Sequence, residues 1–189
     1  MHRPTVFLIG GFARAGKDTL ANRIADLTGA SKVAFADDLK AAGNSFFTRL
    51  GIESVDLKDE QHKTRFRDLL VAAGKAARSV DPDVFARHAA ERARYNILAG
   101  RCVVIPDWRY ANEMSVVWKT VSPARVVNVL IERFNGGPAN EEEGRTVAEI
   151  IDNCTIDEAR IFNSGDLASI DTFAHELVDK YVPQVPAAR

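Results

Sequence analysis

The feature that most constrains the fold of this chain is an apolar run that leads straight into a glycine-rich loop and then into a helical pattern. Residues 5–9 are apolar or β-branched and end at Gly10-Gly11, which predicts a buried strand. Residues 17–27 carry apolar side chains at helical spacing. The segment between them, GFARAGKDT, has the spacing Gly-x4-Gly-Lys. A strand, such a loop and a helix in this order predict an α/β domain that binds phosphate groups.

The glycine-rich loop also predicts how a nucleotide would be held. Gly11 and Gly16 let the backbone wrap with its N–H groups inward, and the helix that follows adds the positive end of its dipole. Lys17 would reach the terminal phosphates, unless the segment is only a glycine-rich turn with an exposed lysine. Asp18 stands where a Ser or Thr usually offers a hydroxyl to Mg²⁺, and Thr19 follows one residue later. Two interpretations stay open: Asp18 or Thr19 approaches the metal through water, or Asp18 caps the helix and contacts phosphate indirectly.

Four further segments have the composition of strands, and helical patterns separate most of them. They are residues 32–36, 101–108, 124–132 and 159–163, and a last helix is predicted over residues 166–181. Pro106 has no N–H to donate, so its strand is expected to end there. The alternation predicts an α/β fold: a P-loop NTPase-type three-layer sandwich with a mainly parallel, about five-stranded sheet flanked by helices. Ligands bind such sheets at the carboxyl ends of the strands.

Composition and charge limit the classes of function. The 189 residues are 46% hydrophobic and 27% charged, so we expect one globular domain over residues 1–183 and a flexible tail over 184–189. A formal net charge of -1 argues against stable nucleic-acid or membrane binding, which leaves small-molecule nucleotides as the expected partners. Cys102, Cys154 and the histidines show no spacing typical of a disulfide framework or a metal cluster. No apolar run is long enough to span a membrane, so a cytoplasmic location is expected.

Four segments, in order along the chain, resemble those of the phage-type deoxynucleoside monophosphate kinases: GFARAGKDT, FADDLK, VVIPDWRYANEM and IFNSGDL. The similarity extends from Val6 to the final helix, and Gly-Lys-Asp-Thr is itself a feature of that family. The resemblance implies a P-loop enzyme of the nucleoside monophosphate kinase fold. Such an enzyme transfers the γ-phosphate of ATP to a deoxynucleoside monophosphate, with Mg²⁺, in the host cytoplasm if it is phage-encoded. A homodimer is one open alternative for the oligomeric state.

A monophosphate kinase needs a second cationic site for the acceptor, expected among helices over residues 37–100. In the helical pattern of residues 62–80, the core-facing stripe is expected to be Phe66, Leu69, Leu70, Ala73, Ala77 and Val80. The adjacent stripe is Arg67, Val71, Gly74 and Arg78, with the glycine allowing close approach of a ligand. Along a straight helix the two arginines would be about 16 Å apart, so they share a phosphate only if the helix ends near Gly74-Lys75. A solvated helix face is the alternative.

The resemblance assigns Arg67, Gly74 and Lys75 to acceptor binding and places the ring of Phe85 near the base. A core position is the other interpretation of Phe85.

The strand over residues 101–108 brings an acidic residue, Asp107, to the edge of the sheet where ligands bind. In P-loop enzymes such an acid usually holds Mg²⁺ or its waters, and the two-residue spacing puts Arg109 on the same side. The resemblance implies that both residues contact the deoxynucleotide, with Glu113 supporting Arg109. A salt-bridged loop is the alternative. We expect Lys17, Arg14 and Asp107 to be the catalytic residues.

The segment RFNGGPANEEEGR, within residues 133–146, has the composition of a mobile loop. Closing over the transferred phosphate, it would exclude water and supply Arg133 or Arg145, and a plain solvated loop is equally compatible with the sequence. Thr146 and Glu149 match a capping box, which predicts that a helix starts there. The resemblance places the turn at residues 163–166, with Asn163, near the adenine of ATP.

Two other functions stay open. One is a P-loop kinase of another small phosphorylated metabolite, since a single fold hosts many acceptors. The other is a nucleotide-dependent ATPase or switch in nucleic-acid handling, against which the near-neutral charge and the lack of a basic stripe argue.

Overall fold

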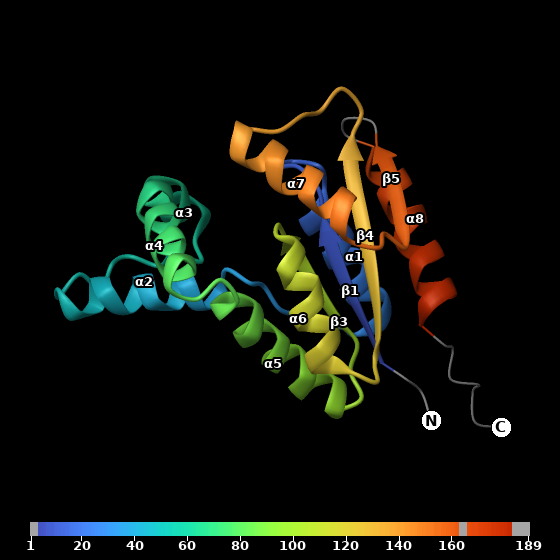
Figure 1. Cartoon of the computed structure of the whole chain (residues 1–189), viewed down its shortest axis with the longest axis horizontal. Helices are drawn as coiled ribbons and strands as arrows, with labels where there is room; N and C mark the ends of the chain where they lie inside the picture. Colours follow the sequence, from blue (N-terminus) through green and yellow to red (C-terminus); the bar gives the residue numbers. More distant parts are fainter. Residues whose placement is uncertain (1–3, 163–165, 183–189) are drawn as a thin grey trace.

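The computed structural model describes residues 4–162 and 166–182, and its centre is a five-stranded parallel sheet in the order β2-β3-β1-β4-β5 (Figure 1). The strands are β1 (Thr5–Gly10), β2 (Ser31–Lys32), β3 (Val103–Trp108), β4 (Arg125–Arg133) and β5 (Glu158–Phe162). The helices are α1 (Lys17–Thr28), α2 (Asp37–Arg49), α3 (Glu60–Arg65), α4 (Arg67–Val80), α5 (Val84–Leu98), α6 (Ala111–Val121), α7 (Glu141–Asn153) and α8 (Leu167–Tyr181). The predicted α/β sandwich with a parallel sheet is confirmed. The predicted tail, residues 184–189, lies outside the described residues.

The alternation of side chains along β1 divides the core into two layers. Phe7 and Ile9 pack with residues of α1 and α8 on one face of the sheet. Val6 and Leu8 pack on the other face with residues of α5, α6 and α7. Because β1 is buried on both faces and paired on both edges, its carboxyl end, where the glycine-rich loop begins, is held rigidly. None of the helices in the described ranges is long and apolar enough to cross a bilayer.

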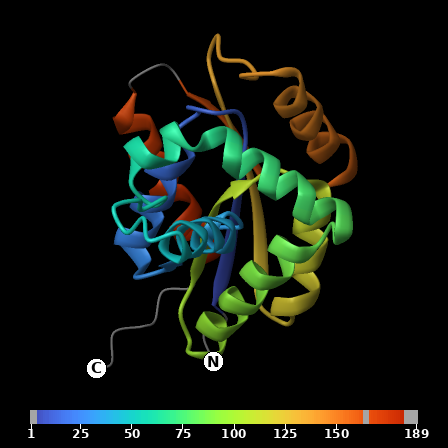
Figure 2. The ribbon, with the colours of Figure 1, turned by 90° about the vertical axis from the view of Figure 1, so that its left-hand side faces the viewer.

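Helices α2, α3 and α4 form a helical lobe that projects away from the sheet (Figures 1 and 2). The predicted core stripe of α4 is wrong, because Leu69, Ala73 and Val80 are exposed and Gly74 is the buried residue of this helix. The helical pattern is also interrupted at Phe66, which ends α3 and precedes α4. α4 packs mainly on α2, and Ala77 is the member of its predicted stripe that packs, half-buried, against the main core.

Two strand predictions are corrected in their boundaries. β3 continues past Pro106 to Trp108, and the register with β1 shifts at this point, where Leu8 pairs with Ile105 and Gly10 with Trp108. The irregular register accommodates a residue without an N–H. β2 has only two residues, although Val33 still donates to the carbonyl of Val104 over 3.0 Å. The N–H of Ala34 donates to the carboxylate of Asp37, and the two N–H groups after it donate to Asp107, so the ladder does not continue.

The predicted helix start at Thr146 is also wrong. α7 begins at Glu141, and the side chain of Asn140 caps it by accepting a hydrogen bond from the N–H of Glu143. Thr146 is buried inside the helix, where its hydroxyl donates to the carbonyl of Glu143. Asparagine is as good an N-cap as threonine, so the earlier cap was equally available in the sequence.

Candidate functional site

The glycine-rich loop lies between β1 and α1, where the sequence places it, and its backbone requires glycine. Gly11 has a φ of 132°, and a Cβ there would lie 1.9 Å from the carbonyl oxygen of Ile131. Gly16 has a φ of 99° and is the N-cap of α1. Arg14 also has a positive φ, 62°, and its side chain is exposed. These conformations let the loop turn tightly over the end of β1.

Lys17 folds back across the loop from the first turn of α1. Its Nζ donates to the carbonyl of Gly11 over 2.8 Å and to that of Phe12 over 2.7 Å. Burial lowers the pKa of Lys17, and the positive charge of Arg109 lowers it further. The charges of Glu143, Asp18 and Asp107 act in the opposite direction. The two carbonyl bonds hold the ammonium group across the loop, where a phosphate would approach it.

A cavity of about 310 Å³ adjoins the loop. Its lining combines residues of the loop with the ends of β4 and β5 and the start of α8: Arg14, Ala15, Gly16, Lys17, Asp18, Thr19, Arg133, Phe162, Asp166, Leu167 and Ile170. Phe162 and Ile170 give it an apolar wall next to the cationic loop, which suits a ligand with a ring at one end and phosphates at the other. The carboxylate of Asp166 is engaged in capping α8, where it accepts from the N–H and the hydroxyl of Ser169. Asn163 lies outside the described residues.

Asp107 connects the sheet to the turn before α2. One carboxylate oxygen accepts from the N–H of Phe35 and the other from the N–H of Ala36, both over 3.0 Å. Burial raises the pKa of Asp107, although these two hydrogen bonds and the charge of Arg109 act to lower it. Both oxygens therefore fix the backbone of the turn between β2 and α2 in this structure.

Glu113 is buried at the start of α6. One of its oxygens accepts from the backbone N–H groups of Arg109 and Tyr110 over 2.9 and 3.0 Å. Burial raises the pKa of Glu113 to about 8 in spite of these bonds. Glu113 thus holds the backbone of Arg109, while the side chain of Arg109 is exposed.

On α4 the two arginines of the predicted stripe are at opposite ends. α4 runs unbroken from Arg67 to Val80, so Arg67 and Arg78 are about 16 Å apart and do not meet at one phosphate. The guanidinium carbon of Arg78 lies 4.8 Å from the ring centre of Phe85 and 4.5 Å from that of Tyr110. A Cβ on Gly74 would lie 3.2 Å from Nη1 of Arg78, so this arginine occupies the space that the glycine leaves. The Phe85 ring is buried in the core and contacts Arg78.

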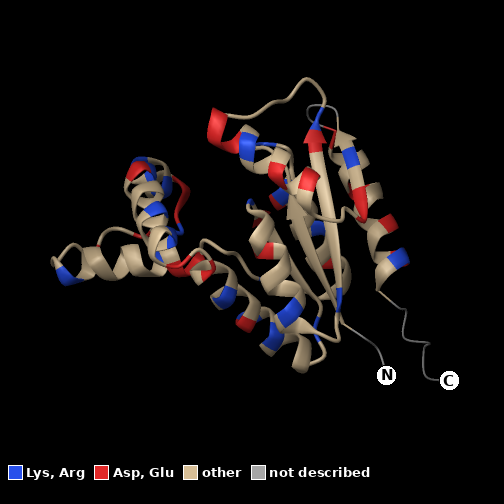
Figure 3. Cartoon of the chain, in the orientation of Figure 1, with Lys and Arg blue, Asp and Glu red and all other residues tan. Residues whose placement is uncertain are grey.

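The first turn of α7 contacts both the glycine-rich loop and the helical lobe. Glu143 accepts from the N–H of Ala13 over 2.8 Å and from that of Ala139 over 2.6 Å. Glu142 forms an ion pair with Lys75 of α4, with 2.7 Å between Nζ and Oε2. Figure 3 colours acidic residues at the start of α7 and basic residues along the helical lobe.

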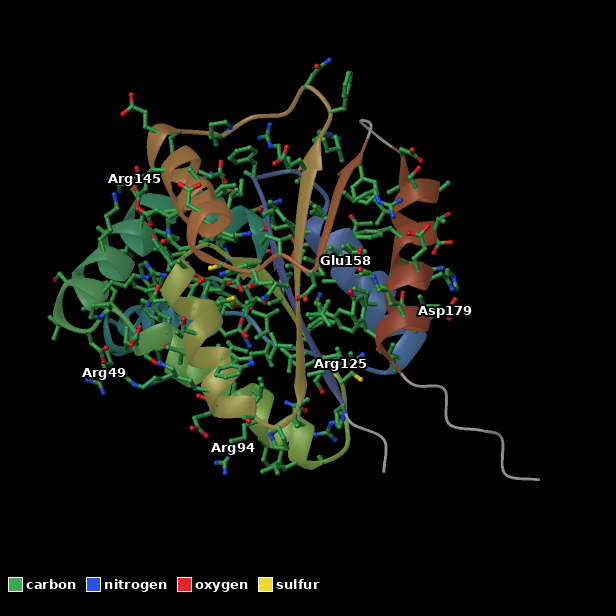
Figure 4. All side chains as sticks on the ribbon, turned by 45° about the vertical axis from the view of Figure 1, so that its right-hand side comes forward. Arg49, Arg94, Arg125, Arg145, Glu158 and Asp179 are labelled. Atoms are coloured by element: carbon green, nitrogen blue, oxygen red, sulfur yellow. The ribbon has the colours of Figure 1, made fainter. Side chains whose placement is uncertain are left out.

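Arg133 and Arg145, predicted to act from the closing loop of residues 133–146, lie near the two ends of that segment, whose second part belongs to α7. Arg133 ends β4 and lines the cavity. Arg145 is exposed on α7, and Figure 4 shows it on the side of the helical lobe (Figure 4).

Three residues of this site were not predicted from the sequence: Tyr110, Glu142 and Glu143. Three consecutive glutamates after a good N-cap are a signal for a helix start, which would have moved the boundary of α7. No sequence signal indicates which loop or helix these side chains contact. Within residues 4–162 and 166–182, no three His, Cys, Asp or Glu side chains gather as a metal site.

Comparisons with known proteins show the fold. No protein-family profile matches the sequence, and no curated protein matches it. Among solved structures, the chain is similar to the APS kinase of Mycobacterium tuberculosis in complex with AMPPNP and APS, at 13% identity and a TM-score of 0.50, covering 95% of this chain and 98% of that one. It is similar to dephospho-CoA kinase from Campylobacter jejuni, at 10% identity and a TM-score of 0.50, covering 94% and 97%.

A gluconokinase from Sinorhizobium meliloti 1021 has 14% identity and a TM-score of 0.50, covering 96% of this chain and 95% of its own. The chain therefore has the fold of the P-loop kinases, in agreement with the resemblance seen in the sequence. The narrower resemblance to phage-type enzymes stays a prediction.

Proposed function

We propose that this protein transfers the γ-phosphate of ATP to a deoxynucleoside monophosphate. The observation that carries the proposal is the position of Lys17, which is held over a phosphate-binding loop beside a cavity and near the charge of Arg109. A second group of cations acts on Glu142 at the start of α7: Lys75 pairs with it, and the charges of Arg78 and Arg145 lower its pKa. One cationic site for the donor and another for the acceptor are what such a reaction needs.

ATP would bind with its triphosphate on the loop and its adenine toward the apolar wall of the cavity. Asp18 and Thr19 both line the cavity next to Lys17, so an acidic and a hydroxyl oxygen are available to hold Mg²⁺, directly or through water. When bound, Mg²⁺ would neutralise charge on the phosphates. Arg133, which also lines the cavity, would contact the nucleotide.

The residues of this chain would act by position and charge. Lys17 and Arg14 would stabilise the charge that develops as an oxygen of the acceptor phosphate attacks the γ-phosphorus and ADP leaves. Arg109 would orient the acceptor, with its backbone fixed by Glu113. Asp107 would act by holding the turn before α2 at the acceptor side, because both of its oxygens already accept hydrogen bonds.

A coupled assay of ADP release, with ATP, Mg²⁺ and each deoxynucleoside monophosphate in turn, tests the proposal. Chromatography of the products would identify the diphosphate. Formation of a diphosphate from at least one acceptor is the expected result. Binding of ATP without a product from any deoxynucleotide would contradict it.

A kinase of another small phosphorylated metabolite is the second candidate. It is favoured by the fold neighbours, whose names include an APS kinase and a dephospho-CoA kinase. A panel of non-nucleotide phosphorylated acceptors in the same assay separates the two candidates.

A further inference from the structure

The first turn of α7 places an acidic side chain among the cations that the proposed function gives to the acceptor. Glu142 Oε2 lies 2.7 Å from Nζ of Lys75 on α4. The hydrogen bond with Lys75 lowers the pKa of Glu142, and the charges of Lys75, Arg145 and Arg78 lower it further. The Glu142 carboxylate is therefore an anion that pairs with Lys75 of α4 and is stabilised by the charges of Arg78 and Arg145.

We propose that Glu142 takes the place of the acceptor's phosphate in the unliganded protein and that an anionic acceptor must displace it. This inference rests on the proposed function, because Lys75 is taken there as an acceptor-binding residue. It makes Glu142 a specificity-determining residue, since its competition for Lys75 sets the affinity for the acceptor. The substrate class is an acceptor that carries a phosphate group.

The ion pair has the properties of a contact that can be exchanged. The side chains of Lys75 and Glu142 are 58% and 38% exposed, and ion pairs at such exposure contribute little to stability. A phosphate brings up to two negative charges and three strong acceptor oxygens, so it competes well with one carboxylate. A neutral sugar or nucleoside carries no negative charge that could replace Glu142 as the partner of Lys75. Displacement therefore favours phosphorylated acceptors over neutral ones.

Displacement would release α7 from the helical lobe while leaving it attached to the glycine-rich loop. Within the described part of the chain, Lys75–Glu142 is the one ion pair that joins α4 to α7. The neighbouring Glu143 accepts from the N–H of Ala13, and this bond does not involve α4. The acceptor site can thus open without disturbing the loop that would hold ATP.

Kinetics of the Glu142→Gln variant test the inference, with Glu141→Gln as the matched control. Glu141 is exposed and forms no ion pair within the described residues. Its substitution by glutamine removes the same charge as Glu142→Gln does. We expect Glu142→Gln to lower KM for the acceptor by a factor of up to about five, the upper end for an exposed ion pair, with KM for ATP unchanged. Lys75→Gln should raise KM for the acceptor, and Glu142→Gln should lower KM by a smaller factor in the Lys75→Gln background than in the wild type, because only the charges of Arg78 and Arg145 then act on Glu142. The inference is overturned if Glu142→Gln and Glu141→Gln have the same acceptor KM.

A binding measurement separates failure of this inference from failure of the proposed function. Hydrogen exchange of residues 134–145 is compared in inorganic phosphate and in potassium chloride of equal ionic strength. Phosphate should accelerate exchange in the wild type and not in Lys75→Gln, while Glu142→Gln should exchange fast in both salts. If this response appears but no deoxynucleotide is phosphorylated, the role of Glu142 stands and the proposed acceptor is wrong. If deoxynucleotides are phosphorylated and phosphate has no effect on exchange, the role of Glu142 is wrong.

Discussion

Arg78 of α4 stacks on Tyr110, the residue before α6, with 4.5 Å between the guanidinium carbon and the ring centre. Phe85 lies within 4.8 Å of the same guanidinium, so two rings fix the direction of this arginine. A cation held in one position loses little conformational freedom when it binds an anion. Tyr110 is therefore a positioning residue for Arg78.

Substitution of Tyr110 by leucine should weaken acceptor binding through Arg78. Because a cation–π contact at a partly exposed site contributes about 0.5–1 kcal/mol, we expect KM for the acceptor to rise about two- to fivefold. KM for ATP should not change. Tyr110→Phe keeps the ring and should behave like the wild type, and steady-state kinetics with each substrate varied in turn would measure both. Equal acceptor KM values in the leucine and phenylalanine variants would contradict the role of the ring.

Lys17→Ala should remove most of the activity without unfolding the protein. The ammonium group is aimed across the glycine-rich loop by two carbonyl oxygens, and losing one preorganised charge of this kind typically costs about 10²–10³ in kcat. The measurement is turnover in the ADP-release assay, together with circular dichroism to check folding. Lys119→Ala, at an exposed position of α6, is the control. Wild-type turnover in Lys17→Ala would rule out a loop that acts on phosphates.

Gly11→Ala should destabilise the protein more than an ordinary glycine substitution does. Its Cβ would lie 1.9 Å from the backbone oxygen of Ile131, and this contact cannot be relieved by moving a side chain. We expect a loss of more than about 3 kcal/mol in the free energy of unfolding. Gly29→Ala is the matched control, because Gly29 also has a positive φ, 67°, but has no atom near the new Cβ. The free energy of unfolding should fall by about 1 kcal/mol in Gly29→Ala. Urea unfolding of both variants would show whether the steric contact or the φ angle dominates.

Glu113→Gln should change how stability depends on pH. The pKa of Glu113 is raised from 4.5 to about 8 in the folded state, so the folded protein keeps a proton that the unfolded chain releases. The stabilisation that this proton provides is complete below pH 4.5 and is lost as pH rises to 8. Glutamine cannot titrate, and its single oxygen can accept from Arg109 and Tyr110 as Glu113 Oε2 does.

The free energy of unfolding, measured in urea between pH 5 and pH 9, should therefore fall less steeply with pH in Glu113→Gln than in the wild type up to about pH 8. The pKa of Asp107 is also raised, so its titration contributes to the pH dependence of the free energy of unfolding in both proteins. Parallel curves for the two proteins would show that Glu113 is ionised in the folded state throughout this range.

The sequence determined the parts of this protein that depend on residues close together in the chain. The apolar run of β1, the glycines of the loop and the helical spacing of α1 act within a few residues of one another, so their structure could be predicted. The same holds for the parallel α/β fold, because strands and helices alternate along the chain.

The tertiary structure decided which distant residues meet. Asp107 had the position of a ligand-binding acid, but the N–H groups of Phe35 and Ala36 engage both of its oxygens. The apolar stripe of α4 looked like a core face, yet α4 packs in the helical lobe and leaves Leu69 exposed. Glu142 and Lys75 are 67 residues apart and form an ion pair only because α7 and α4 come together in the fold. Such contacts depend on the packing of whole elements, and local sequence patterns carry no information about that packing.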